Sequence, residues 1–243
     1  MDHKAFFRPV AGADTAVLLV HGIVGTPRQF DFLLDMIPQN WSIYNLLLDG
    51  HGRSVGDFSR TSMKKWKQQV ADALSELCRT HERVYLIGHS MGTMLEMEAV
   101  RDHPQVAGLL LLGVPLRPWL KISMCLRSVG YALGILPKSD PLWKACSVKP
   151  DWRLWRYIGW IPRFWELLRL CSRWRREIAH VQLPVWAVQS QKDEMVSMRS
   201  SRYLRNHPSI RYVQLPQSMH FSYSPEDVAT IRGCFDDMIH RQM

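Results

Sequence analysis

The stretch that decides the fold reads VYLIGHSMGTMLEMEAVR and covers residues 84–101. Its first four residues form a short apolar run, which predicts a buried strand, and residues 91–101 have the pattern of a helix. The motif Gly-x-Ser-x-Gly lies between the two, with Ser90 at its centre. On a strand–turn–helix, this motif indicates a sharp turn that exposes a nucleophilic serine at the helix N-terminus. The tight turn requires small flanking residues, which fits Gly88 and Gly92. The alternative is that Ser90 only caps the helix.

A serine nucleophile needs a base to accept its proton. In a strand–turn–helix site of this type the order along the chain is Ser, then Asp or Glu, then His. Two histidines precede the last predicted helix, His207 and His220. His207 stands at a helix end before a proline, which is typical of a polar surface residue. His220 follows the apolar run IRYVQL in a strand-end loop, so we predict that His220 is the base.

The acid that orients the base should follow the preceding strand. Asp193 fits, because the run VWAVQ ends shortly before it and a turn would present its carboxylate to the imidazole. Glu194 is the rival, and it could instead be solvated. Position favours Asp193, although both acids serve in this role.

An oxyanion site needs two N–H donors. The residue after the nucleophile, Met91, should supply one. The loop HGIVGTP follows the first long apolar run, and Ile23 in this loop should supply the other through its backbone. His21 is expected to be structural, as a polar anchor for the loop.

Further strands are predicted at residues 16–20, 42–48, 106–112, 185–189 and 210–215, with helices at 61–78, near 198–205 and from Pro225. We expect Ser224 to cap that last helix. This alternation predicts an α/β protein, a mostly parallel twisted sheet with helices on both faces. The active site of such a sheet lies at the carboxyl ends of its strands.

Residues 115–181 differ from the rest of the chain. They contain thirteen Lys/Arg and four acids, a balance of +9 that equals the net charge of the whole protein, and seven of the ten tryptophans. We therefore predict an inserted, mainly helical cap at 115–181 in a neutral core of 1–114 and 182–243.

Residues 163–176 have helical spacing, with Phe164, Leu167, Leu168 and Cys171 on one face and charged residues on another. In the simpler interpretation this apolar face roofs the site and the arginines are solvated. In the other, the basic, Trp-rich surface contacts an anionic membrane or a phosphate-bearing substrate such as an acyl-CoA. Charge alone would permit nucleic acid, but no nucleic-acid-binding motif is present, so no such partner is expected.

The remaining composition points to a cytoplasmic protein without cofactor or metal. The N-terminal residues lack the apolar run of a signal peptide, and residues 119–136 are too short and too charged to span a membrane. Five scattered cysteines without a CxxC pair predict free thiols. No His/Cys cluster has metal-ligand spacing.

The motifs HGIVGTP, DGHGRS, GHSMG, QKDEMV and SMHF, in this order, resemble those of bacterial carboxylesterases and monoacylglycerol lipases of the α/β-hydrolase superfamily. The resemblance covers about residues 16–114 and 182–240. It implies the α/β-hydrolase fold, the triad Ser90, Asp193 and His220, the oxyanion donors Ile23 and Met91, and a cap at 115–181. The cap of this chain is richer in tryptophan and arginine than is usual in these esterases.

This reading leads to a serine hydrolase that cleaves carboxylic esters, short- to medium-chain acyl esters or monoacylglycerol-like lipids, through an acyl-serine intermediate. Its partner is a small ester with an apolar acyl part. The same triad could instead cleave a thioester or a carbon–carbon bond. A third hypothesis is a ligand-binding receptor or regulator on a hydrolase scaffold.

Overall fold

The computed structural model describes residues 3–240, without the side chain of Asp102. Within these residues, seven strands form one sheet in the order β1-β3-β2-β4-β5-β6-β7. Strands β2 to β7 pair in parallel, and β1 pairs antiparallel with β3 at one edge. The strands are β1 (Phe6–Arg8), β2 (Thr15–Val20), β3 (Ser42–Leu46), β4 (Arg83–His89), β5 (Val106–Leu112), β6 (Val185–Ser190) and β7 (Ile210–Leu215). The predicted α/β fold with its mostly parallel sheet is confirmed.

The central strands are mainly apolar because both faces of the sheet are covered. Every residue of β2 and of β6 is buried. The six parallel strands were all predicted from such runs. The edge strand β1 was not, because three residues, two of them exposed phenylalanines, carry too little pattern.

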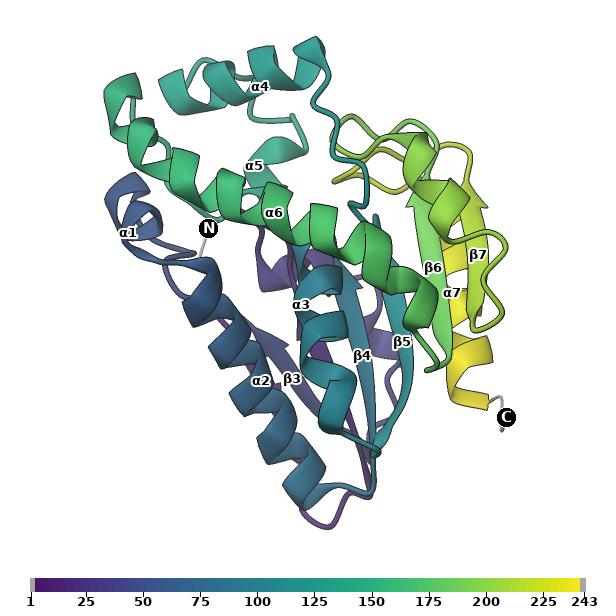
Figure 1. The fold of residues 1–243 in the computed structure, drawn as a ribbon. Helices are drawn as coiled ribbons and strands as arrows, with labels where there is room; N and C mark the ends of the chain where they lie inside the picture. The colour runs from purple at the N-terminus through teal and green to yellow at the C-terminus, as the bar shows by residue number, and fades with distance from the viewer. Residues whose placement is uncertain (1–2, 241–243) are drawn as a thin grey trace.

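Helices cover both faces of the sheet (Figure 1). The α-helices are α1 (Val55–Arg60), α2 (Met63–Thr80), α3 (Met91–Ala99), α4 (Ile122–Leu133), α5 (Leu142–Ala145), α6 (Ile161–Glu177) and α7 (Pro225–His240). Short 3-10 helices are η1 (Pro27–Phe30), η2 (Leu34–Met36), η3 (Val100–Asp102), η4 (Leu154–Trp160), η5 (Ile178–His180) and η6 (Met198–Tyr203). One core cluster lies under α2, α3 and α6, and a second lies under α7 and the 3-10 helix η1. The helix predicted near 198–205 is thus the 3-10 helix η6.

The chain between β5 and β6 forms α4, α5, η4, α6 and η5. Helix α4 lies beyond the upper end of the sheet, whereas α6 runs down across its front face (Figure 1). The C-terminal half of α6 packs into the core through Leu170, Cys171 and Trp174, all buried. The division into a core and a cap stays a prediction, because α6 lies in the predicted cap segment but packs into the hydrophobic core of the sheet domain.

No helix within the described residues combines the length and the apolar composition that crossing a bilayer requires.

Candidate active site

Ser90 stands in the turn between β4 and α3, with φ 52° and ψ −118°. In residues 3–240, Ser90 and Val24 are the two non-glycine residues with positive φ. This conformation is strained for an L-residue and persists only where the surrounding structure holds it. The Ser90 side chain makes no capping hydrogen bond to α3, so the alternative that Ser90 only caps the helix is wrong.

Three glycines allow the close packing around this turn. A Cβ at Gly92 would overlap the carbonyl group of Val20, and one at Gly88 would lie 2.8 Å from the backbone nitrogen of Thr93. The predicted need for small residues on both sides of Ser90 is therefore confirmed. A Cβ at Gly22 would lie 2.9 Å from the Cβ of Ser90, so the HGIVGTP loop approaches the serine directly.

His220 and Asp193 form a hydrogen bond of 2.8 Å between Nδ1 and Oδ2. Both side chains are about 1% exposed. Asp193 follows β6 and His220 follows β7, so the two lie at the carboxyl ends of neighbouring strands. The second carboxylate oxygen, Oδ1, accepts hydrogen bonds of 2.7 Å from the backbone N–H groups of Met195 and Val196. The carboxylate is thus held by three donors in a fixed orientation.

The pairing sets the charges of both groups. Burial alone would raise the pKa of Asp193, but the neighbouring His220 and the two backbone N–H groups outweigh it and lower the pKa. Burial alone would lower the pKa of His220, but Asp193 and Glu194 outweigh it and raise the pKa. The aspartate therefore stays ionised and accepts the Nδ1 proton, which leaves Nε2 of His220 as the basic nitrogen.

Ser90 is linked to this pair through its neighbour in the chain. The ring of His89 lies 4.8 Å from that of His220, and its Nε2 hydrogen-bonds to the His220 carbonyl at 3.0 Å. Burial, and secondarily His220, lowers the pKa of His89 to about 3, so His89 is neutral and its Nε2–H is the donor. Among the described residues, the Ser90 hydroxyl makes no hydrogen bond to His220 itself; this bond is often long in free enzymes.

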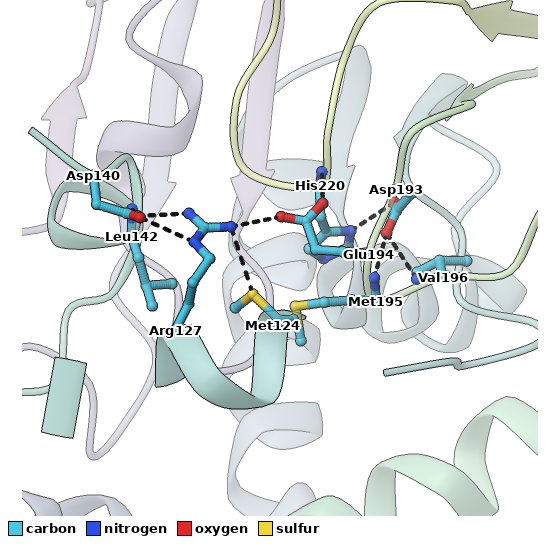
Figure 2. Close-up of polar contacts among 9 residues, drawn as sticks. All are labelled: Met124, Arg127, Asp140, Leu142, Asp193, Glu194, Met195, Val196 and His220. Carbon is cyan, nitrogen blue, oxygen red and sulfur yellow. Dashed lines mark hydrogen bonds and ion pairs between the residues drawn. The ribbon is translucent and has the colours of Figure 1, made fainter. Parts of the chain in front are cut away.

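Glu194 is buried, and the alternative that it is simply solvated is wrong. Its Oε2 accepts a hydrogen bond of 3.0 Å from the backbone N–H of His220. Its Oε1 pairs with Arg127 of α4, also at 3.0 Å. Arg127 in turn binds Asp140 through its Nε, at 3.0 Å. Figure 2 shows this row of charges, with Glu194 between the arginine and the histidine loop.

The other predicted histidine roles agree with the structure. His21 is buried, contacts the Gly22 carbonyl at 2.8 Å through Nδ1, and accepts the Leu48 N–H at 3.1 Å through Nε2. It therefore anchors the loop, as expected. His207 accepts the backbone N–H of Ser209, away from Asp193.

Of the two expected oxyanion donors, Met91 is next to Ser90 in the chain and Ile23 belongs to the loop that approaches Ser90 in space. Met91 is the first residue of α3, and the first N–H groups of a helix have no partner within the helix. Ile23 follows Gly22 in the loop that approaches Ser90 and is buried. Their arrangement agrees with the predicted role, which stays a prediction.

A cleft of about 460 Å³ opens beside His220. Its walls include His89, Phe221, Tyr223 and Phe32, and Lys144 of α5 closes one side. Two larger clefts lie between α6 and helices α2 and α3, without any of the predicted catalytic residues in their walls. The cleft is large enough for a small ligand, and of the predicted catalytic and oxyanion residues only His220 lines it.

Sequence reasoning missed three residues of this site. Gly113 packs under the pair, since a Cβ there would lie 3.5 Å from Cε1 of His220, and its φ of +64° favours glycine. His89 was seen only as the variable residue of the motif. Arg127 carried no signal, because its partner Glu194 is 67 positions away.

Comparisons with known proteins place this chain among hydrolases. The family model described as "Serine aminopeptidase, S33" matches residues 11–153, more than half of the chain. A thermostable monoacylglycerol lipase of Bacillus sp. (strain H-257) is 30% identical over 94 residues, 38% of each chain. An uncharacterised protein of Mycobacterium bovis is 30% identical over 45% of this chain and 31% of its own length. The alignments thus span less than half of these relatives.

Solved structures share the fold over nearly the whole chain. One of the metagenome-derived lipolytic enzymes LipS and LipT has a TM-score of 0.74 at 18% identity, covering 99% of this chain and 98% of its own. A monoglyceride lipase of Saccharomyces cerevisiae has a TM-score of 0.69 at 15% identity, covering 97% and 90%. At such identities the likeness establishes the α/β-hydrolase fold alone.

Proposed function

Because this chain belongs to the α/β-hydrolase family described as serine aminopeptidase, S33, we propose that it cleaves carboxylic esters through an acyl-serine intermediate. One observation carries the proposal. A strained serine without a capping bond lies one residue from His89, which touches His220, and His220 is hydrogen-bonded to the buried Asp193. Ser90 is the nucleophile, His220 the base, and Asp193 the residue that orients the base.

The reaction follows from these positions. The Ser90 oxygen attacks the ester carbonyl while its proton moves to Nε2 of His220. The backbone N–H groups of Ile23 and Met91 stabilise the negative oxygen of the tetrahedral intermediate. Collapse releases the alcohol, which takes the proton from His220. Water then attacks the acyl-serine with the same base, and the acid product leaves.

The substrate is a short- to medium-chain acyl ester or a monoacylglycerol-like lipid. The cleft beside His220 supports this size, and Phe32 and Phe221 in its walls offer apolar contact to an acyl chain. The relatives described as monoacylglycerol lipases point the same way. Residues 115–181 act as the cap, since α5 forms one side of the cleft. The five free cysteines favour a reducing compartment, which supports a cytoplasmic location.

The first test is turnover of p-nitrophenyl esters from acetate to palmitate by the wild type and by Ser90→Ala. We expect the substitution to lower turnover on the order of 10⁶-fold, and Asp193→Asn to lower it about 10⁴-fold. Ser75→Ala on the exposed face of α2 and His207→Ala are matched controls, and both should keep normal turnover. Full activity of Ser90→Ala would refute the assignment.

The rival activities need other substrates. Acyl-CoA thioesters, vinylogous diketones and aminoacyl p-nitroanilides, run beside the esters, separate thioester, carbon–carbon and aminopeptidase cleavage from ester cleavage. If none turns over but a fluorophosphonate labels Ser90, the machinery is intact and the bond class is wrong. If Ser90 is not labelled either, a ligand-binding role on this scaffold takes first place.

A further inference from the structure

The exposed apolar residues of this protein are concentrated in one segment. Of the seventeen large apolar side chains exposed within the described residues, fourteen lie between residues 119 and 168. Ile122 and Ile135 are 79% and 74% exposed, and Trp152 is 67% exposed. Single exposed apolar residues are ordinary on any protein, but a gathering of this size marks an interaction surface.

The gathering consists of two apolar ridges. The first follows one face of α4, where exposed residues recur at helical spacing: Ile122, Leu126, Val129 and Leu133. The second runs through η4 into the start of α6. An almost wholly apolar surface groove lies within it and is lined by Tyr157, Trp160, Ile161, Phe164, Trp165 and Leu168. Figure 1 places α4 and the N-terminal end of α6 at the same upper end of the molecule, beyond the sheet.

The charges of residues 115–181 are unbalanced. All four acids of residues 115–181 are already paired with arginines: Asp140 with Arg127, Asp151 with Arg153 and Arg156, Glu166 with Arg163, and Glu177 with Arg101 and Arg173. Within the described residues, seven exposed bases of this segment have no acidic partner: Arg117, Lys121, Lys138, Lys144, Lys149, Arg169 and Arg176. Arg169 instead lies over the ring of Trp165, with its charge free for an external anion.

We propose that the outer surface of residues 117–176 docks on an anionic phospholipid bilayer. Apolar ridges of Ile, Leu and Trp enter the boundary between headgroups and acyl chains, and the unpaired bases contact lipid phosphates. A second copy of this chain is a poor occupant, because two surfaces of the same positive sign repel each other. Nucleic acid would match the bases but would leave the isoleucine and leucine ridges exposed.

This surface and the proposed catalytic residues are separate groups, so docking can be measured without turnover. The docked orientation turns α4 toward the lipid, with α5, which borders the cleft beside His220, in the same segment.

The test is sedimentation of the Ser90→Ala protein with vesicles of phosphatidylcholine alone or mixed with phosphatidylglycerol. We expect binding to the mixed vesicles that weakens as salt rises, and little binding to phosphatidylcholine alone. Lys121→Gln and Arg169→Gln should each lower partitioning to mixed vesicles about fivefold. Ile122→Ser with Leu126→Ser should lower it at least about tenfold, at every salt concentration.

Matched controls lie outside the segment. Lys64→Gln removes an exposed base of α2, and Phe6→Ser removes an exposed apolar side chain of β1, and neither should change partitioning. Circular dichroism verifies that each variant is folded. The proposal is overturned if mixed vesicles bind no protein at low salt, if the controls weaken binding equally, or if light scattering without vesicles reveals a dimer that Leu126→Ser disrupts. Because the Ser90→Ala protein is used, failure here leaves the proposed hydrolysis untouched.

Discussion

Glu194 is a second carboxylate at the imidazole, and its charge is balanced from outside the loop. It accepts the His220 backbone N–H, and it raises the pKa of His220 together with Asp193. Arg127 neutralises it from α4. His220 must be neutral to act as a base. The Arg127–Glu194 ion pair therefore adjusts the pKa of His220 without having to touch the substrate.

The acid side of the pH–rate profile should report this adjustment. Turnover falls at low pH as His220 becomes protonated, so a lower His220 pKa moves the acid limb to lower pH. Glu194→Gln removes one negative charge and should shift the limb of kcat/KM to lower pH. Glutamine keeps an acceptor for the His220 N–H, so the plateau should fall by less than about tenfold.

Arg127→Gln is the opposing variant. It leaves the Glu194 charge unbalanced, and the acid limb should move to higher pH. A purely structural role would lower the plateau in both variants without moving either limb, and that result would exclude the electrostatic role.

Ser90, Asp193 and His220 could be predicted from the sequence because each follows a predicted strand, and the structure places each after a strand and pairs Asp193 with His220. Their catalytic roles stay predictions. The alternative that Glu194 is solvated is wrong, since neither the burial of Glu194 nor its partner Arg127 on α4 is visible in the local sequence. The hydrogen bonds that His220 makes with Glu194 and Asp193 join residues 26 and 27 positions apart, which a short window of sequence does not contain.

At the scale of an element, the buried face of α6 is rotated about the helix axis relative to the apolar face that the sequence predicted. The helix was predicted correctly, but with Leu168 on its apolar face. The buried stripe is Leu167, Leu170, Cys171 and Trp174, while Leu168 is 46% exposed. Several apolar stripes fit a helix this rich in leucine and tryptophan, and only its packing against α3 and α2 selects one.

Arg163 of this helix differs from the simpler interpretation, in which the arginines are solvated. It binds the Ser59 carbonyl at 3.1 Å, and its partner Glu166 accepts the Met63 N–H at 3.0 Å. This pair ties the start of α6 to the junction of α1 and α2.

Unfolding in urea distinguishes the two leucines. Leu170→Ala leaves a cavity in the core and should lower the free energy of unfolding by about 2–4 kcal/mol. Leu168→Ala removes the same atoms from an exposed position and should cost less than about 1 kcal/mol. A larger loss for Leu168→Ala than for Leu170→Ala would mean that α6 packs through the face that was first predicted.

At the scale of the whole molecule, the reactivity of the five cysteine thiols reports how tightly the structure is packed. All are free; Cys125 on α4 is exposed and the other four are buried. Burial raises the pKa of Cys146 and of Cys234 to about 11, and that of Cys171 to about 12, so these thiols are also poor nucleophiles.

A thiol reagent such as DTNB should therefore modify one cysteine rapidly in the native protein and all five in denaturant. Cys125→Ser should abolish the rapid phase. Rapid reaction of a second thiol would show that the packing around one of the four buried cysteines opens readily.

The alternation of strands and helices along the chain was predictable, because each parallel strand is a short apolar run. The course of residues 115–181 was not, since insertions follow no rule of alternation. Composition did single out this segment, and its excess charge coincides with the apolar ridges of the folded molecule.

Helix α4 carries both exposed apolar side chains and the arginine that pairs with Glu194. Its outer side bears Ile122 and Leu126, and Arg127, the next residue, reaches inward to Glu194. A push on the outside that tilts this helix would lengthen the Arg127–Glu194 bridge and change how tightly His220 holds its proton. A displacement of α4 by a contact on its outer side would therefore alter the protonation of His220 through this one ion pair.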